Sequence, residues 1–373
     1  MARWRGAMAL LLCLLCSVCF LGGCKRSKEA EVVLGLNLEL SGRLSQYGNE
    51  CLRGARLAEQ ELEKRGLPYR VRLAVVDNRS ENSDSVLGFL RLTKEEGAVC
   101  VIGPTTSAGV KAELQQGSQV PVIVPTATSD SLDGAEYGNR FRICFTDTAQ
   151  GRAMGECAWA MGYRRAAVLG DLSSDYSQGT SEAFCRRFTE LGGEVAARLS
   201  YTAGDTDFSV LLTLLRDSRP QAVFLPGYDA EAGLILRQAR QMGLDCAFFS
   251  GDTFDSPVLE ELAGEGLDKV YFSNHYDPQG ERLEEFAERF EAEYGEFPSA
   301  YASLGYDSVM LFADALVRAD SPEPQDIAAA LGETEGYPGV TGDITFDGRG
   351  NAVKIPIVNA IVRGERRVLR MRG

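Results

Sequence analysis

Residues 98–129 read AVCVIGPTTSAGVKAELQQGSQVPVIVPTATS and contain the same local pattern twice. In each copy a short apolar run, 98–102 or 120–124, is followed directly by a loop rich in hydroxyl side chains. Continuous apolar runs of this kind are typical of strands in a parallel sheet that is covered on both faces. Ligands of such sheets bind beyond the carboxyl ends of the strands, so the two loops are also candidate binding segments.

The same alternation of strand-like and helix-like stretches extends through the rest of the chain. Further apolar runs predict strands at 32–36, 71–76, 166–169, 222–225, 247–249 and 270–272. Amphipathic stretches predict helices that include 50–65, 86–96, 283–294 and 302–318. The alternation predicts an α/β protein with two doubly wound parallel-sheet lobes. A late strand pair, 342–346 and 355–362, is predicted around an Asp347-Gly348 turn.

The N-terminus has the pattern of a secretory signal peptide over residues 1–23, because two arginines precede an apolar run at 7–21. That run is shorter than the roughly twenty residues that a spanning helix needs. The sequence Leu21-Gly22-Gly23-Cys24 resembles the lipobox of bacterial lipoproteins, in which the cysteine is acylated. We therefore expect an exported protein that is held to a membrane through lipidated Cys24, with 24–30 as a tether. An anchor helix that ends in cysteine by chance is the alternative.

Length and charge limit the function further. The 373 residues exceed what one hydrophobic core usually supports, which predicts two lobes. The chain carries 53 acidic and 39 basic residues, a formal net charge of −14. Nucleic-acid affinity depends on Lys and Arg at the phosphates, so this balance argues against a nucleic-acid partner.

Motifs for catalysis are absent from the sequence. His275 is the single histidine, and no G-x-S-x-G elbow or phosphate-binding G-x-x-x-x-G-K-[ST] loop occurs. We expect His275 to be structural or exposed, and the chain to have no catalytic residue, cofactor or metal. Once the leader and Cys24 are set aside, six cysteines remain without metal-site spacing, and the sequence leaves their pairing open: Cys51, Cys100, Cys144, Cys157, Cys185 and Cys246.

Binding chemistry is better represented, at the ends of predicted strands. Ser107 and Thr128 lie in the two hydroxyl-rich loops, which suit a small anion such as a carboxylate. Asp252 follows the strand at 247–249, where it could accept hydrogen bonds from an ammonium group. Each of these residues could instead cap a helix. Aromatic residues in glycine-flanked loops could form the walls of a pocket: Tyr47, Tyr176 and Tyr228.

These segments together carry a resemblance. The sequence resembles the periplasmic branched-chain amino-acid-binding proteins of ABC transporters, which have the type I periplasmic-binding-protein fold. The similarity extends from about residue 31 to residue 362, and the matching segments include Gln46-Tyr47-Gly48, Val101-Ile102-Gly103-Pro104 with Ser107, Pro125-Thr126-Ala127-Thr128, Asp175-Tyr176, Gly227-Tyr228, Gly251-Asp252 and Ser299-Ala300-Tyr301.

The resemblance implies how a ligand is bound. It places the ligand α-carboxylate at Ser107, Ala127 and Thr128 in one lobe, and the α-ammonium at Asp252 in the other. It also places Tyr47, Tyr176 and Tyr228, with Tyr301 as a further neighbour, around the ligand. Closure of the lobes would then complete the set of hydrogen bonds.

The resemblance also implies a role and a domain division. We expect a monomeric receptor that captures an aliphatic, branched-chain amino acid and delivers it to an ABC permease in the membrane. The alternatives are a ligand-sensing protein of the same fold, or a receptor for an amide, urea or an aromatic acid. The expected lobes are 31–146 with 277–338, and 147–276 with 339–373. A three-crossing hinge is expected near 144–149, 273–278 and 337–342.

Overall fold

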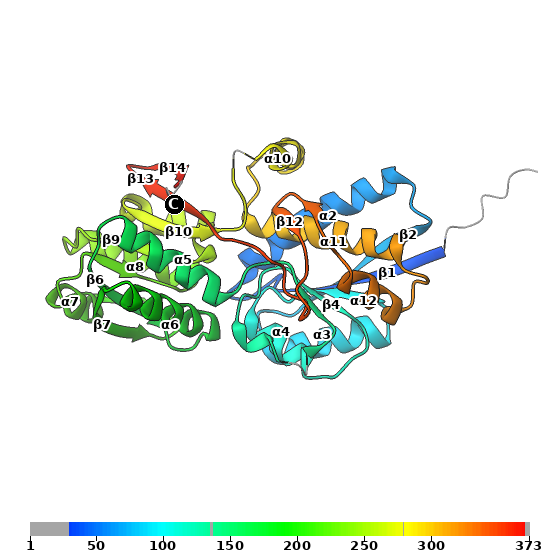
Figure 1. Cartoon of the computed structure of the whole chain (residues 1–373), viewed down its shortest axis with the longest axis horizontal. Coiled ribbons are helices and arrows are strands. Elements are labelled where there is room, and N and C mark those ends of the chain that lie inside the picture. The colour runs from blue at the N-terminus through cyan, green and yellow to red at the C-terminus, as the bar shows by residue number, and fades with distance from the viewer. Residues whose placement is uncertain (1–29, 135–136, 279, 370–373) are drawn as a thin grey trace, which may run out of the picture.

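The two apolar runs at 98–102 and 120–124 form β3 (Cys100–Ile102) and β4 (Val122–Val124), neighbouring strands inside a five-stranded sheet. The computed structural model describes residues 30–134, 137–278 and 280–369, so the predicted leader and Cys24 lie outside the described residues. Within these ranges the chain forms two α/β lobes side by side (Figure 1). No helix in the described ranges has the length and apolarity needed to cross a bilayer.

The first lobe is built on a fully parallel sheet. Its strand order is β2 (Tyr69–Asp77), β1 (Ala30–Leu38), β3, β4 and β5 (Arg140–Arg142). The main apolar cluster packs one face against α2 (Ser45–Arg65), α10 (Glu281–Tyr294), α11 (Ala300–Arg318) and α12 (Pro324–Gly332). A second cluster packs the other face against α3 (Asn82–Lys94) and α4 (Ser107–Leu114). Helices on both faces explain why the central strands β3 and β4 are continuously apolar.

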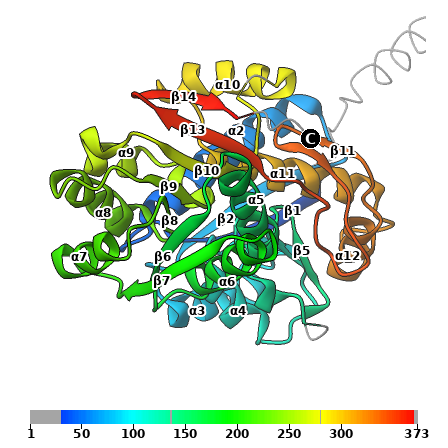
Figure 2. The ribbon, with the colours of Figure 1, turned by 60° about the vertical axis from the view of Figure 1, so that its left-hand side comes forward.

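The second lobe is built on a seven-stranded sheet with a mixed edge. Its strand order is β14 (Glu365–Val368), β13 (Ile357–Val362), β10 (Val270–Asn274), β9 (Ala247–Ser250), β8 (Ala222–Phe224), β6 (Arg165–Asp171) and β7 (Glu194–Tyr201). One face packs against α7 (Ser209–Asp217), α8 (Asp229–Gln241) and α9 (Pro257–Ala263). The other packs against α5 (Asp147–Ala160) and α6 (Asp175–Glu190), which lie side by side (Figure 2). Strands β13 and β14 pair antiparallel.

Three connections join the lobes, and the third lies later than the sequence predicts. The first runs from β5 to α5 and the second follows β10, near the predicted hinge segments. Residues 339–352, however, stay with the first lobe, because Ile344, Phe346 and Ala352 belong to its apolar cluster. We therefore assign 353–356 as the third crossing instead of 337–342, and 339–352 to the first lobe. Figure 1 shows this connection running to β13.

The predicted late strand pair is wrong for the same reason. Strand β12 (Gly342–Ile344) pairs with β11 (Tyr337–Gly339), whereas β13 pairs with β10 and β14. The Asp347 carboxylate closes a tight turn by accepting the backbone N–H groups of Arg349 at 2.8 Å and Asn351 at 2.9 Å. The turn therefore forms as predicted and joins a short antiparallel pair, Phe346 with Ala352, while Asn351 also pairs with Arg142 of β5.

Helices α2 and α11 pack closely enough to exclude any side chain at two positions. A Cβ atom on Gly54 would lie 1.8 Å from the carbonyl oxygen of Ala302, and one on Gly305 would lie 2.2 Å from that of Cys51. These contacts are with backbone atoms, which cannot move aside as the end of a flexible side chain can. The glycines therefore set the spacing of the two helices beneath the sheet of the first lobe.

We expect Gly305→Ala to lower the free energy of unfolding by about 1–3 kcal/mol, because the methyl group forces the two helices apart. This loss should appear although alanine is the better helix former by roughly 1 kcal/mol. Chemical denaturation measures the change. Gly332→Ala is the matched control, because its Cβ would meet nothing closer than Phe141 at 3.8 Å. Equal effects of the two substitutions would contradict the close-packing explanation.

Candidate functional site

A small cavity of about 20 Å³ lies between the lobes, at the carboxyl ends of their strands. The first lobe lines it with Tyr47, Thr105, Thr106, Ser107, Thr126, Thr128 and Tyr301. The second lobe lines it with Tyr176, Tyr228, Asp252 and Thr253. Every lining side chain therefore carries a hydroxyl or a carboxylate. A larger hollow of about 650 Å³ lies at the edge of the first lobe beside β5 and α12, and none of the predicted site residues lines it.

Six of the seven predicted site residues line this cavity, and Ala127 does not. The Ala127 side chain is buried in the apolar cluster behind the cavity. Two of the three tyrosines do not lie in loops as the sequence suggested: Tyr47 and Tyr176 lie in the first turns of α2 and α6. Tyr228 lies in the loop between β8 and α8, as predicted. Helix α2 begins five residues earlier than predicted.

A buried glutamate holds the loop after β3 in place. Glu39, 1% exposed, accepts hydrogen bonds from the backbone N–H of Thr105 at 3.0 Å and from its hydroxyl at 2.6 Å. It also accepts the hydroxyl of Thr106 at 3.0 Å. Gly103 allows the loop to approach β1, because at its φ of +96° a Cβ atom would lie 2.3 Å from the carbonyl oxygen of Asn37. The loop then ends at the N-terminus of α4, where helix geometry favours an anion.

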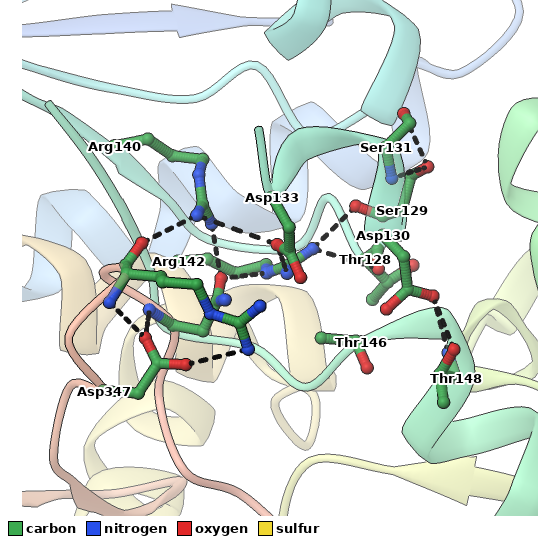
Figure 3. Close-up of polar contacts among 12 residues, drawn as sticks. Thr128, Ser129, Asp130, Ser131, Asp133, Arg140, Arg142, Thr146, Thr148 and Asp347 are labelled. Carbon is green, nitrogen blue, oxygen red and sulfur yellow. Dashed lines mark hydrogen bonds and ion pairs between the residues drawn. The ribbon is translucent and has the colours of Figure 1, made fainter. Parts of the chain in front are cut away.

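The loop after β4 is held by a buried arginine (Figure 3). Arg142 donates to the carbonyl oxygens of Thr128 at 3.1 Å and Ser129 at 2.8 Å, and it forms an ion pair with Asp133. Thr128 also accepts the backbone N–H of Asp147 at 2.8 Å, which ties this loop to the start of α5. The position of Thr128 at the cavity is thus set by the first crossing between the lobes.

Asp252 is held from two sides in the second lobe. Its backbone N–H donates to the side-chain oxygen of Gln150 at 3.2 Å. Its carboxylate Oδ2 lies 2.8 Å from Nε2 of His275, and the two side chains are 3% and 1% exposed. Burial lowers the pKa of His275 below its ordinary value of 6.5, although the hydrogen bond to Asp252 opposes this shift. The imidazole is therefore neutral at pH 7.

The tyrosines form a continuous aromatic cluster across the cavity. Tyr47 lies between Tyr301, with a centroid distance of 4.7 Å, and Tyr228, at 5.6 Å, and Tyr176 lies 5.9 Å from Tyr228. Burial raises the pKa of Tyr47 and Tyr176 well above 10, so both phenols stay protonated at neutral pH. They can donate hydrogen bonds without adding charge.

Several contacts join the lobes around the cavity. The hydroxyl of Tyr47 accepts the backbone N–H of Asp229 at 3.1 Å. Arg43 lies 3.3 Å from the Glu231 carboxylate, and Lys111 lies 3.8 Å from that of Asp175. These contacts form only when the lobes are close together, so the arrangement described is a closed one.

Sequence reasoning missed the residues that support the site. Glu39 directly follows β1, and its partner Thr105 lies 66 positions away along the chain. Gln150 lies in the first turn of α5, and its partner Asp252 lies 102 positions away. His275 was expected to be structural or exposed, and it is buried against Asp252. A position directly after a strand is the one signal that could have suggested Glu39 and His275.

Among the residues that the structure describes, no group of three or more His, Cys, Asp and Glu side chains could hold a metal ion. The six cysteines whose pairing the sequence left open are all buried free thiols.

Comparison with known proteins gives a consistent result. The model of a family described as periplasmic binding proteins matches residues 31–358. The Leu/Ile/Val-binding protein homolog 2 of Brucella abortus is 28% identical over 352 residues, covering 92% of this chain and 93% of that protein. The crystal structure of the leucine-binding protein LivK from Thermotoga maritima has a TM-score of 0.86 and 33% identity, covering 91% of this chain and 98% of that one. The LivJ protein of Streptococcus pneumoniae, in complex with isoleucine, has a TM-score of 0.86 and 30% identity over 91% of this chain and 99% of that one.

Asp147 at the start of α5 gives a test of the site's electrostatics. Burial raises the pKa of Asp147 to about 8, so the folded protein holds a proton there that the unfolded chain releases near pH 4. Its contribution to the free energy of unfolding therefore falls as the pH rises from 4 to 8. We expect Asp147→Asn to remove this fall. Between pH 5 and pH 8 the free energy of unfolding of the variant should therefore rise by at least about 1 kcal/mol relative to that of the wild type.

Urea denaturation of the ligand-free protein at several pH values measures this difference. Asp217→Asn, at the exposed end of α7, is the control and should follow the wild-type pH profile. Parallel profiles for the wild type and Asp147→Asn would show that Asp147 is ionised in the folded protein.

Proposed function

This chain belongs to the periplasmic binding protein family, and from that premise we propose that it captures an amino acid between its two lobes for an ABC importer. The family makes it a solute-binding receptor and not an enzyme. One observation carries the ligand assignment: a buried carboxylate, Asp252, in one lobe faces hydroxyl groups at a helix N-terminus in the other across one small cavity. These groups complement the ammonium and the carboxylate of an amino-acid zwitterion.

The first lobe would bind the ligand carboxylate. Ser107 stands at the first position of α4, where unpaired backbone N–H groups and the helix dipole attract an anion. The hydroxyl groups of Ser107 and Thr128 line the same wall of the cavity. Ala127 lies behind this wall, so any contribution from it would be through its backbone.

The second lobe would bind the ligand ammonium. The Asp252 carboxylate has a neutral partner in His275, so its charge is available to a cation. A charge-assisted hydrogen bond in a buried site is stronger than one between neutral groups. Tyr47, Tyr176 and Tyr228 would enclose the ligand.

The remaining walls suit a small aliphatic side chain. The threonine hydroxyls already donate to the protein: Thr105 and Thr106 to Glu39, Thr126 to the carbonyl oxygen of Thr105, and Thr253 to that of Gly227. With these donors occupied, a ligand side chain meets methyl groups and phenol rings. The solved relatives named for leucine, or bound to isoleucine, agree with this class.

The partner and location complete the proposal. The contacts of Arg43 with Glu231 and of Tyr47 with Asp229 would form as the ligand draws the lobes together. The closed receptor, a monomer, would then present both lobes to a permease.

Lipidated Cys24 would keep the receptor at the membrane surface. Cys24→Ser should therefore move the protein from the membrane fraction to the soluble fraction after cell lysis. A variant that stays with the membrane would argue against lipidation.

A thermal-shift screen of the chain from residue 25 tests the ligand. We expect L-leucine, L-isoleucine or L-valine to raise the melting temperature, because a ligand at 100 times its Kd adds about 2.7 kcal/mol of stability. Asp252→Asn should abolish the shift, since it removes the charge that pairs with the ammonium. Asp217→Asn should leave the shift unchanged.

Other responses would revise the proposal in defined ways. A shift with an amide, urea or an aromatic acid, and with no amino acid, would keep the receptor function and refute the zwitterion site. If leucine stabilises Asp252→Asn as much as it stabilises the wild type, the role of Asp252 is refuted while the receptor function stands.

A further inference from the structure

The single histidine of the chain lies where two crossings between the lobes meet the site. His275 directly follows β10, the strand that leads into the second crossing. Its ring stacks on that of Phe145, from the first crossing, with a centroid distance of 3.8 Å and an interplanar angle of 13°. Its Nε2 lies 2.8 Å from Oδ2 of Asp252. The ring is therefore fixed by a hinge residue on its face and by a site residue at its edge.

The hydrogen bond fixes which ring nitrogen carries the proton. A carboxylate accepts hydrogen bonds and cannot donate them, so Nε2 of His275 must be the protonated nitrogen. Nδ1 is then a bare acceptor, buried and without a hydrogen-bond partner among the described residues. Acidification would add the next proton at Nδ1 and turn the ring into a cation in contact with Asp252.

The charged groups around the ring decide when that proton binds. Asp252 and Asp255 favour the imidazolium, Lys354 from the third crossing disfavours it, and burial disfavours it most, lowering the pKa of His275. Asp255 is itself paired with Arg366, and Lys354 donates to the hydroxyl of Thr341. Asp147 faces Asp252 from α5. The neutral ring is thus the form present at pH 7.

We propose that His275 is a positioning residue that orients Asp252 for the ligand ammonium, and that its protonation weakens ligand binding in acid. The inference rests on the proposed function, because it assumes that a cation is bound at Asp252. With the ring neutral, Asp252 offers its full charge to the ligand. An imidazolium at 2.8 Å competes for the same carboxylate and repels the ammonium.

Linkage fixes the sign and the limit of the effect. If the ligand and a proton on His275 exclude each other, the Kd rises as the pH falls, by at most about tenfold per pH unit for one proton. Because burial lowers the pKa of His275, the rise should be confined to the acid side of its ordinary value of 6.5.

Isothermal titration with L-leucine, L-isoleucine and L-valine between pH 5 and pH 8 tests the proposal on protein without a histidine tag. The wild-type Kd should rise several-fold between pH 7 and pH 5. His275→Gln keeps an amide donor near the place of Nε2 and does not titrate, so it should bind at pH 8 within a few-fold of the wild type and lose the rise. His275→Phe keeps the stacking on Phe145 and lacks the donor, so it should bind more weakly at every pH.

Two results would overturn the proposal: a wild-type pH profile in His275→Gln, or wild-type affinity in His275→Phe. Nitrogen-15 NMR of the one histidine provides a readout that needs no ligand. We expect an Nε2–H tautomer, with a pKa below 6.5 that falls further in Asp252→Asn. An Nδ1–H tautomer, or a pKa that ignores Asp252→Asn, would refute the pairing. If none of the three amino acids binds while the NMR result holds, the ligand assignment fails and the Asp252–His275 pair stands.

Discussion

A buried carboxylate between the lobes is the constraint on which the rest of the site depends. An ionised carboxylate loses much solvation free energy when it leaves water, so it must be met by hydrogen bonds or by a cation. The described partner of the Asp252 carboxylate, the neutral ring of His275, supplies a hydrogen bond without a positive charge, and the side-chain oxygen of Gln150 accepts the backbone N–H of Asp252. This balance holds Asp252 in place while leaving its charge for a ligand. A permanent arginine partner would have occupied the carboxylate.

The hinge provides the supports of the site. Asp147 and Gln150 begin α5 after the first crossing, and His275 stands at the second. The loop of Thr128 is bonded to the backbone of Asp147, while Asp252 is bonded to Gln150 one helical turn further on. The groups that we propose to bind the ligand carboxylate and the ligand ammonium are therefore linked through one turn of helix.

The sequence predicted what depends on local patterns and missed what depends on distant packing. The loops with Ser107 and Thr128 could be found because apolar runs end just before them. The start of α2 was missed because Gly48 suggested a loop. In the fold Gly48 is helical, and it is glycine because a Cβ atom would lie 2.2 Å from the carbonyl oxygen of Glu39. Similarly, the turn at Asp347 forms as predicted, but nothing local shows that Asn351 also pairs with β5 or that the strand at 357–362 pairs with β10. The contact of His275 with Asp252 joins two strand ends whose adjacency follows only from the order of the sheet.

Closure and affinity are coupled through the same exclusion of water. The contacts between Tyr47 and Asp229 and between Arg43 and Glu231 bring the lobes together, and the cavity that remains is small. In the closed form, the low dielectric would strengthen the attraction between a bound ammonium and Asp252. The same low dielectric raises the desolvation free energy of the Asp252 carboxylate when the lobes close without a cation. A ligand with a positive charge thus favours the closed form more than a neutral analogue of the same shape. In the proposed function, selection for a zwitterion would then arise from closure itself as well as from the individual contacts with the ligand.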